Sequence, residues 1–453
     1  IYTLSLHDAL PIYEITQKLD AAKNDLHGEQ KLEQDKQQAT ERINQMKSLN
    51  HAQKDELNHE IQQAQTRPDI VATVNKAKPL DTAMKKLRDS IADANDIKQT
   101  SNYINEVPSI QNAYDNAVDH AQQIINQTSN PTMDPLVIER DTSNVQTTKN
   151  NLHGERVLND DKRTQTYAVN HLDNLNQAQK EALTHEIQQA TRVSDVNNVY
   201  SKARALDSEM QKLKDIVGQQ DSVRKTSNYV NEDSTAQQAY NDAIAQGQAI
   251  IDQTTQPTMS NDEIENTINK IKQKVTTLEG EHKLQVAKEN ANNVIDSLSN
   301  LNTPQKIAEK ALINKATTRD NVTQQMHIAE ELNDAMGKLR NSIQDQATVR
   351  QESRYINENE DKQQAYNHAV TDAESVINEH NPTLNKDTIE QLTQQVNLAK
   401  DALNGVKLLN EDKQTAHQTI STLNHLNTAQ QQAFNEQINN APTRAEVQQI
   451  IGQ

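Results

Sequence analysis

The sequence predicts an all-α fold, an elongated rod of tandem three-helix bundles. Hydrophobic residues make up only 33% of the 453 residues, with no Trp and a single Phe. At this density they can line one narrow stripe per helix, which suits many thin bundles and excludes one wide globular core. Eight Gly and ten Pro are too few for a turn-rich β protein, and the abundant Ala, Gln, Glu, Lys and Leu favour helices.

A repeat of fixed length organises the chain. The segment SNYINE around Tyr103 returns as SNYVNE around Tyr229 and as SRYINE around Tyr355, each time 126 residues later. A second set of tyrosines keeps the same spacing: Tyr114, Tyr240 and Tyr366. A fixed period of this kind indicates a repeat architecture. A unit of 126 residues is too long for one helical hairpin and fits two bundles of three helices.

Glycine and proline occupy further repeated positions. Half of the glycines share one position in the repeat: Gly28, Gly154, Gly280 and Gly405. We expect each to end a helix in a left-handed conformation. A loop of Asn or Gln, Pro and Thr also recurs, at Pro131, Pro257 and Pro382. Proline cannot continue a helix, so these loops are predicted turns.

Helical periodicity supports the division into bundles. After Pro108, four apolar residues recur at the spacing of a single helix face: Tyr114, Val118, Ala121 and Ile125. A further helix is expected over residues 134–152. A third begins near Pro68 and has no stop before Ser101, which predicts a helix of about 30 residues shared between adjacent bundles. Pro79 should kink it, whereas Ala205 and Glu331 at the matching positions should leave it straighter. Such sharing would make the rod stiff.

The repeats resemble known modules. The half with SNYINE, QQAYNDAI and NPTM resembles the FIVAR module, and the half with LNHAQKDELNHEIQQA resembles the three-helix GA module. Their strict alternation resembles the Ebh family of giant staphylococcal extracellular-matrix-binding proteins. The resemblance implies a large adhesin, associated with the cell wall or secreted, that binds host matrix and notably fibronectin. GA modules elsewhere bind albumin, but no albumin-contact residue is carried over.

The repeat divides the chain into modules. Residues 1–12 resemble a translated sequencing adapter and are left out of the fold, and residues 13–27 form the last helix of a truncated FIVAR-like module. GA-like modules are expected at 28–79, 154–205, 280–331 and, truncated, 405–453. FIVAR-like modules are expected at 80–153, 206–279 and 332–404. We therefore read the chain as a fragment whose signal peptide and wall anchor lie outside it.

Several classes of function are excluded. A net charge of −18 argues against nucleic acid as a partner, and no apolar run is long enough to span a membrane. The pattern His59-Glu60, repeated at His185-Glu186, resembles half of a zinc-protease signature, but Gln63 and Gln189 replace the second His. No cysteine, phosphate loop or catalytic triad stands out, so no metal site, cofactor or enzyme activity is expected.

The periodic tyrosines are the candidate repeat interface. Burial in a bundle core explains them best, and a repeated binding patch is the alternative. The proline loops have the same two interpretations, with turn chemistry favoured. The histidines before the repeated glycines, His27 and His153, become Glu279 and Asn404 in the other copies. A ligand role tolerates such changes poorly, so these positions are read as solvated helix ends.

Three functions follow from these patterns. The leading hypothesis is a monomeric rod that binds host matrix, with fibronectin as the expected ligand, through many weak sites. The second is a structural stalk or spacer that supports the cell envelope without binding. The third is an array of albumin-binding GA modules. Binding of fibronectin, fibrinogen and albumin to the purified chain would separate them.

Overall fold

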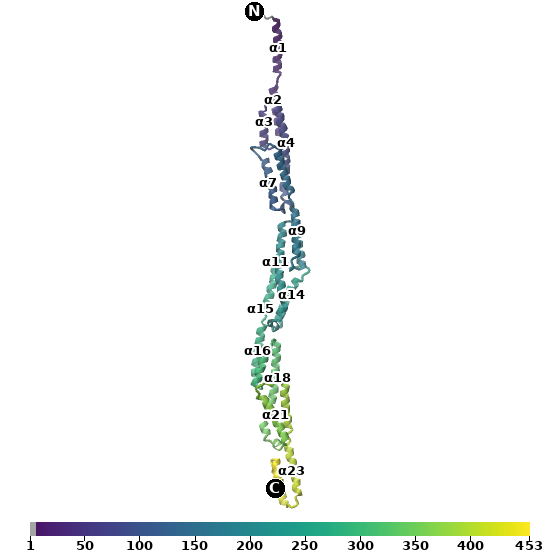
Figure 1. The fold of residues 1–453 in the computed structure, drawn as a ribbon, viewed down its shortest axis with the longest axis vertical. Coiled ribbons are helices and arrows are strands. Elements are labelled where there is room, and N and C mark those ends of the chain that lie inside the picture. The colour runs from purple at the N-terminus through teal and green to yellow at the C-terminus, as the bar shows by residue number, and fades with distance from the viewer. Residues whose placement is uncertain (1–5) are drawn as a thin grey trace. The chain divides into compact units, whose positions relative to one another are not determined.

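A computed structural model describes residues 6–453, and every regular element in that part of the chain is an α-helix (Figure 1). Residues 1–5 of the adapter-like segment lie outside the described residues. The first helix, α1 (Leu6–Asn24), includes the rest of that segment. The chain divides into two compact units: Ile1–Lys212 with Ile250–Ile264, and Leu213–Ala249 with Glu265–Gln453.

The first GA bundle consists of α2 (Gly28–Gln45), α3 (His51–Gln63) and α4 (Arg67–Ile91). The starts of α3 and α4 are fixed by side-chain caps. The Asn50 side chain accepts a hydrogen bond from the Gln53 backbone N–H, and the Gln53 side chain accepts one from the Asn50 N–H. Thr66 and Asp69 form the same reciprocal pair before α4. Such capping boxes satisfy N–H groups that a helix start leaves unpaired.

The long helix α4 belongs to two bundles, as predicted. Its first half packs on α2 and α3, and its second half packs on α7 (Pro108–Ile125) and α8 (Pro135–Asn150). One continuous apolar core runs along it, from Ile43 and Leu57 in the GA bundle to Tyr114 and Val145 in the FIVAR bundle. In Figure 1, α4 lies beside α3 and then beside α7. A shared core of this kind couples the two bundles energetically.

The same order of helices recurs along the chain. The second GA bundle contains α9 (Gly154–Asn170), α10 (Gln177–Gln189) and the start of α11 (Val193–Gly218), and α14 (Ser234–Ile251) and α15 (Asn261–Thr276) follow. The third contains α16 (Gly280–Ser297), α17 (Thr303–Lys315) and α18 (Arg319–Ile343), and α21 (Glu360–Ile377) and α22 (Lys386–Asp401) follow. The last contains α23 (Gly405–Thr422), α24 (Thr428–Asn440) and α25 (Arg444–Gly452).

The shared helices are shorter than predicted. They contain 25, 26 and 25 residues in α4, α11 and α18, so the expectation that the first would continue to Ser101 was wrong. After Ile91 the chain forms two four-residue helices, α5 (Ala94–Ile97) and α6 (Ser101–Ile104). This stretch is rich in Asp, Asn, Ser and Thr, whose side chains compete with helical hydrogen bonding and favour caps. Thr100 caps α6 in this way.

Equivalent short helices follow the other long ones. They are α12 (Gln220–Arg224) and α13 (Ser227–Val230) after α11, and α19 (Gln346–Val349) and α20 (Ser353–Ile356) after α18. The repeated segments SNYINE, SNYVNE and SRYINE thus each begin with a four-residue helix. The chain then turns into the next long helix of the FIVAR module.

The repeated glycines begin helices and do not end them, so that part of the prediction was wrong. Gly154, Gly280 and Gly405 are the first residues of α9, α16 and α23. No described glycine has a positive φ. The reason for glycine at these positions is therefore steric, and it lies in the junction between modules.

The proline loops close the FIVAR helices. Asn130 and Gln256, directly before Pro131 and Pro257, have φ angles of 46° and 48°. Asn is among the residues that tolerate this left-handed region best. The loop before Pro382 is one residue shorter than its two counterparts, and no described residue in it has a positive φ. The residue missing from the last repeat is therefore missing from this loop.

We predict that Pro79→Ala stabilises the first pair of bundles. Helix α4 continues through Pro79, where the absent N–H and the ring cost about 3 kcal/mol relative to Ala in a helix interior. Slower amide hydrogen exchange in α4 would show the effect. Ala205→Pro in α11 is the matched control and should accelerate exchange there. Equal exchange in Pro79→Ala and the parent chain would contradict this interpretation. The kink at Pro79 stays a prediction.

Candidate functional site

The SNYINE segments lie where a FIVAR module meets the next GA module. The side chain of Asn105 donates from Nδ2 to the carbonyl oxygen of Thr191 at 3.0 Å and accepts at Oδ1 from the Val193 N–H at 2.9 Å. Thr191 lies in the turn between α10 and α11, and Val193 is the first residue of α11. One buried amide thus binds a backbone carbonyl oxygen and a backbone N–H where α11 begins, and it ties the FIVAR module to the second GA module.

The other two copies repeat this contact. Asn231 donates to the Thr317 carbonyl oxygen at 3.1 Å and accepts from the Arg319 N–H at 2.8 Å. In the third copy the partners of Asn357 are the Pro442 carbonyl oxygen at 3.1 Å and the Arg444 N–H at 2.7 Å. The three asparagines are buried, with 5%, 2% and 2% of their surface exposed. An amide placed this way loses both bonds if the modules separate.

The glutamate that follows each asparagine makes a second contact. Glu106 is buried, and its carboxylate accepts from the Val107 N–H at 2.9 Å and from the His153 N–H at 2.5 Å. These N–H groups lie at the starts of α7 and α9. The partial positive charge of the two helix starts stabilises a carboxylate between them. The equivalent carboxylates are those of Glu232 and Glu358.

The repeated glycine lets the two backbones approach closely. A Cβ atom on Gly154 would lie 2.6 Å from the Asn102 carbonyl oxygen, and on Gly280 it would lie 2.4 Å from that of Asn228. On Gly405 it would lie 2.6 Å from the Arg354 carbonyl oxygen. A Cβ on Gly28 would meet nothing within 4 Å. Glycine is therefore required where a SNYINE-type segment packs on it. We call the repeated Asn, Glu and Gly together the junction clamp.

The tyrosines pack inside the FIVAR modules. The rings of Tyr103 and Tyr114 meet edge to face with centroids 6.2 Å apart, and the Tyr103 hydroxyl donates to Asp115 at 2.8 Å. Burial, together with the Asp115 carboxylate, raises the pKa of Tyr103 to about 12. The copies Tyr229–Tyr240 and Tyr355–Tyr366 have centroid distances of 5.8 and 6.1 Å.

Each pair has one inner and one outer member. Tyr114, Tyr240 and Tyr366 are at most 1% exposed, so their rings cannot line an accessible binding patch. Tyr103, Tyr229 and Tyr355 are half-buried.

The proline loops also join modules. Asn50 Nδ2 donates to the Ile124 carbonyl oxygen at 2.9 Å, and Gln53 Nε2 donates to the Thr132 carbonyl oxygen at 2.7 Å. The capping box of α3 therefore binds the loop that contains Pro131. Its copies are Asn176 with Gln179 and Asn302 with Gln305, which bind the loops of Pro257 and Pro382.

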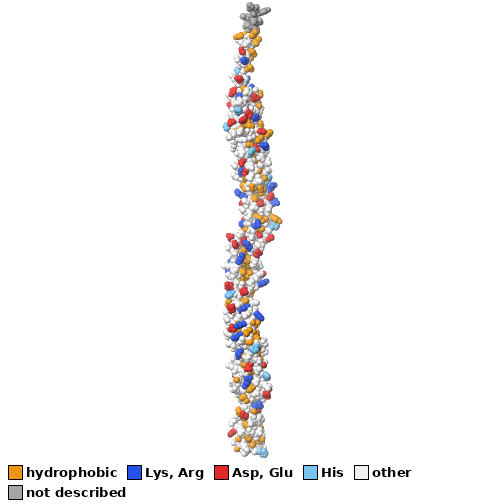
Figure 2. All heavy atoms as spheres, turned by 60° about the vertical axis from the view of Figure 1, so that its left-hand side comes forward, with side chains coloured by type: hydrophobic (Ala, Val, Ile, Leu, Met, Phe, Trp, Pro, Cys, Tyr) orange, Lys and Arg blue, Asp and Glu red, His pale blue; other side chains and the backbone are white. Residues whose placement is uncertain are grey.

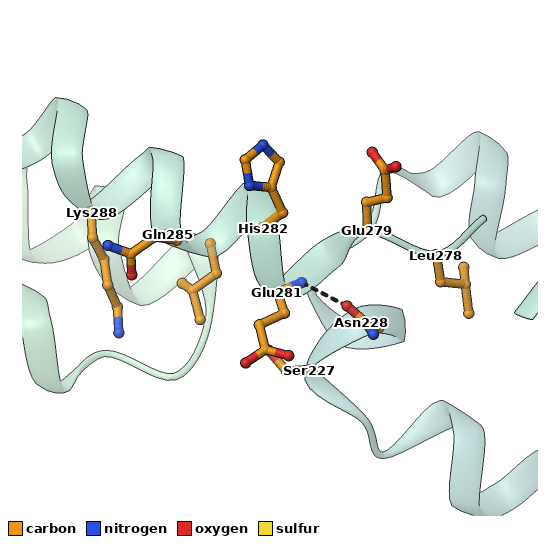
Figure 3. Close-up of a pocket in the computed structure, with 9 residues that line it drawn as sticks. Ser227, Asn228, Leu278, Glu279, Glu281, His282, Gln285 and Lys288 are labelled. Carbon is orange, nitrogen blue, oxygen red and sulfur yellow. Dashed lines mark hydrogen bonds between the residues drawn. The ribbon is translucent and has the colours of Figure 1, made fainter. Parts of the chain in front are cut away.

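The second junction carries an additional charge network. Lys283 Nζ contacts the carboxylates of Glu232 and Asp233, and Arg319 lies 2.7 Å from Asp233. Hydrogen bonds from Lys283 and then Arg319 lower the pKa of Asp233. Figure 3 shows a groove beside this junction, in which the Glu281 N–H donates to Asn228 Oδ1 at 3.1 Å. The Lys288 ammonium at its edge binds the Asn314 carbonyl oxygen at 2.8 Å.

The part of the chain that the structure describes offers neither a metal site nor a membrane-spanning helix. It holds no cluster of His, Asp and Glu suited to a metal ion, nor any helix that is both long enough and apolar enough to cross a bilayer. The glutamates of the His59-Glu60 and His185-Glu186 patterns form ion pairs, Glu60 with Lys76 at 2.5 Å and Glu186 with Lys202 at 3.0 Å.

Sequence reasoning selected the tyrosines and the glycines of the clamp, and it missed the asparagine and the glutamate of the clamp. Asn105 and Glu106 are identical in all three copies, whereas the residue between Tyr and Asn varies between Ile104 and Val230. Comparison of the copies position by position would have singled them out. Their partners were not predictable, because they are backbone atoms about 50 and 90 residues away along the chain.

We predict that Gly154→Ala destabilises the junction, whereas Gly28→Ala does not. The added methyl group must displace the backbone around Asn102, which we expect to cost about 1–3 kcal/mol, while Gly28 has free space. Urea unfolding followed by amide exchange in α9 and α2 measures both effects. A Gly154→Ala variant as stable as Gly28→Ala would mean that the backbones do not approach this closely.

Comparison with known proteins identifies both modules. The FIVAR domain model matches residues 83–153, 209–279 and 335–404, and the GA module model matches 29–83, 155–209, 281–335 and 406–453. Extracellular matrix-binding protein ebh of Staphylococcus aureus strain MRSA252 is 39% identical over 437 residues, which are 96% of this chain and 4% of that protein. EbhA of strain N315 is also 39% identical, over 96% of this chain and 6% of its own length.

A solved structure agrees on the fold. The crystal structure of a fragment of S. aureus EbhA has a TM-score of 0.50 and 26% identity, covering 53% of this chain and 97% of that one. The chain spans only 4–6% of the length of the two full-length S. aureus relatives. FIVAR and GA modules are not enzyme families, and the two alternate strictly along this chain. The chain is built from alternating FIVAR and GA modules and belongs to the Ebh family.

Proposed function

We propose that this chain is a segment of a bacterial surface adhesin that binds host extracellular matrix through many modules at once. The observation that carries the proposal is the clamped repeat: each of the three complete FIVAR modules is joined to both neighbouring GA modules by backbone-directed hydrogen bonds. The relatives are named extracellular matrix-binding proteins. Modules held in series raise avidity, because one bound module keeps its neighbours close to the matrix.

The outward faces of the helices supply the binding surface in this proposal. The clamp residues and the inner tyrosines are buried, so a ligand would contact other side chains. Figure 2 shows hydrophobic side chains as small groups among Lys, Arg, Asp and Glu on the visible face. Single exposed apolar residues such as Leu136, Tyr167 and Leu398, 61–72% exposed, fit weak contacts to a large protein. Fibronectin is the ligand we propose, and the location is the cell surface, associated with the cell wall.

A spacer function has one observation in its favour. The most regular sequence motifs, SNYINE and the proline loop, are occupied by contacts within the chain. Repetition of these motifs therefore needs no ligand to explain it. In this second proposal the modules project another part of a longer protein or support the envelope.

Binding at two surface densities tests the proposed function. Residues 13–453 are attached to beads at low and high density and exposed to fibronectin, fibrinogen and albumin. We expect fibronectin to be retained at high density and to dissociate at low density, because weak sites act together. The triple variant Asn105→Ala, Asn231→Ala, Asn357→Ala should lower the density dependence, because loosened junctions no longer hold the modules together.

No retention of fibronectin or fibrinogen at high density would favour the spacer. If the parent chain, with its GA modules intact, retains albumin and neither fibronectin nor fibrinogen, an albumin-binding array would be favoured.

A further inference from the structure

One GA module buries a carboxyl group at a position where two others bury a leucine. Glu309 is the seventh residue of α17 and is 0% exposed. The seventh residues of the matching helices α3, α10 and α24 are Leu57, Leu183 and Phe434. Leu57 and Leu183 are also 0% exposed. In the third GA bundle, residues 280–331, a carboxyl group therefore occupies the buried position that holds a leucine in the first two bundles.

The hydrogen bonding of Glu309 is incomplete. Its Oε2 accepts from Gln325 Nε2 of α18 at 2.6 Å, and its Oε1 has no hydrogen-bond partner. The positions equivalent to Gln325 hold Thr73, Val199 and Ile450. A buried carboxylate with one neutral partner is costly, because water is removed from a charge that nothing nearby compensates.

Charged groups on α16 and α17 are engaged elsewhere. Lys288 of α16 donates to the carbonyl oxygen of Asn314 at 2.8 Å. Asp296, near the end of α16, pairs with Lys310, the neighbour of Glu309 in α17. Neither lysine bonds to Glu309 among the described contacts.

The remaining neighbours also leave Glu309 without a counter-ion. On α18, His327 pairs with Glu330 at 3.1 Å, and their side chains are 65% and 43% exposed. The loop that packs on the start of α17 carries Glu379, whose carboxylate accepts from the Thr383 N–H. Gln325 is therefore the hydrogen-bond partner on which a charged Glu309 depends.

The apolar core of this bundle is correspondingly small. Six of its buried apolar residues form a cluster of their own: Leu284, Ala291, Ile295, Ile313, Val322 and Ala329. Leu301, also buried, belongs to the cluster of the following FIVAR module. In the first copy a single cluster runs through both modules. Leu312 and Ile328, 40% and 43% exposed, occupy the positions at which Glu60 and Lys76 form a surface ion pair in the first copy. The third bundle thus has a polar residue inside, at position 309, and apolar residues on its surface, at positions 312 and 328.

We propose that the third GA bundle is a pH-dependent weak point of the array, whose helices α17 and α18 open more readily near neutral pH than in mildly acidic surroundings. The cause is the burial of Glu309 among apolar side chains. Protonation turns Glu309 into a neutral donor and acceptor that the core accommodates at lower cost. The inference does not depend on which ligand the chain binds.

The direction and the pH window follow from linkage. Burial raises the pKa of Glu309 above its ordinary 4.5, and the bond from Gln325 opposes this in part. A raised pKa in the folded state makes the bundle most stable at or below about pH 4.5, and this stability is lost as pH rises through the folded pKa. The adjacent clamp sets the lower limit. Burial alone would raise the pKa of Glu232, but bonds from Lys283 and the backbone outweigh it and lower this pKa. The stability that Glu232 contributes is therefore lost as the pH falls below about 4.5.

Hydrogen exchange in the full chain tests the proposal. We compare peptides of α17 and α18 with the matching peptides of α10 and α11, after correction for intrinsic exchange, between about pH 7 and about pH 5. The third bundle should exchange faster at the higher pH, and the difference should shrink at the lower pH. Glu309→Leu should slow exchange of α17 at the higher pH by about tenfold or more and remove its pH dependence.

Two further variants separate charge from packing. Glu309→Gln keeps the shape but cannot ionise, so the third bundle should lose its pH dependence without regaining full protection. Leu183→Glu should transfer the behaviour to the second bundle. Equal protection of both bundles at the higher pH in the parent chain would overturn the proposal. A pH dependence that persists in Glu309→Gln would also overturn it, even if Leu183→Glu fails to fold.

Discussion

The junction clamp is the contact on which the arrangement of modules depends. At each of three junctions a buried asparagine and a buried glutamate bind backbone N–H groups at helix starts of the following GA module. Helix starts leave such N–H groups unpaired. Every GA module therefore presents the same unpaired backbone N–H donors, whatever its side chains are. This explains how the sequences of the modules can diverge while their connection stays the same. The glycine beneath each segment is the steric condition for this contact.

A second constraint operates on the opposite side of each FIVAR module. There the capping box of a GA helix holds the proline loop, and the shared long helix carries packed side chains from one bundle into the next. Each FIVAR module is thus connected before and after by different means. The connection before combines a shared helix with hydrogen bonds from the capping box to the proline loop, and the connection after is the junction clamp. Disruption of one module should be felt by its neighbours in proportion to these contacts.

Much of this architecture was predictable from the sequence. The period, the alternation of two modules, the shared helices and the inward residues Tyr114, Ala121 and Ile125 followed from repetition and helical spacing. The end of α4 was misjudged because the Asp, Asn, Ser and Thr residues after Ile91, of which Thr100 caps α6, outweighed the absence of Gly and Pro. Gly154 was misread because its cause, the Asn102 backbone, is distant in sequence. Glu309 was overlooked because a glutamate in a charged helix gives no sign of burial until its copies, Leu57 and Leu183, are placed beside it.

The claim that the clamp holds the modules is tested most directly by exchange of the amides that donate to it. The N–H groups of Val193, Arg319 and Arg444 lie at helix starts, where no helical partner exists. The structure assigns each to an asparagine side chain. Amide exchange resolved by residue should find them protected to the same degree as the interior amides of their modules. Exchange as fast as that of exposed helix starts would contradict the clamp.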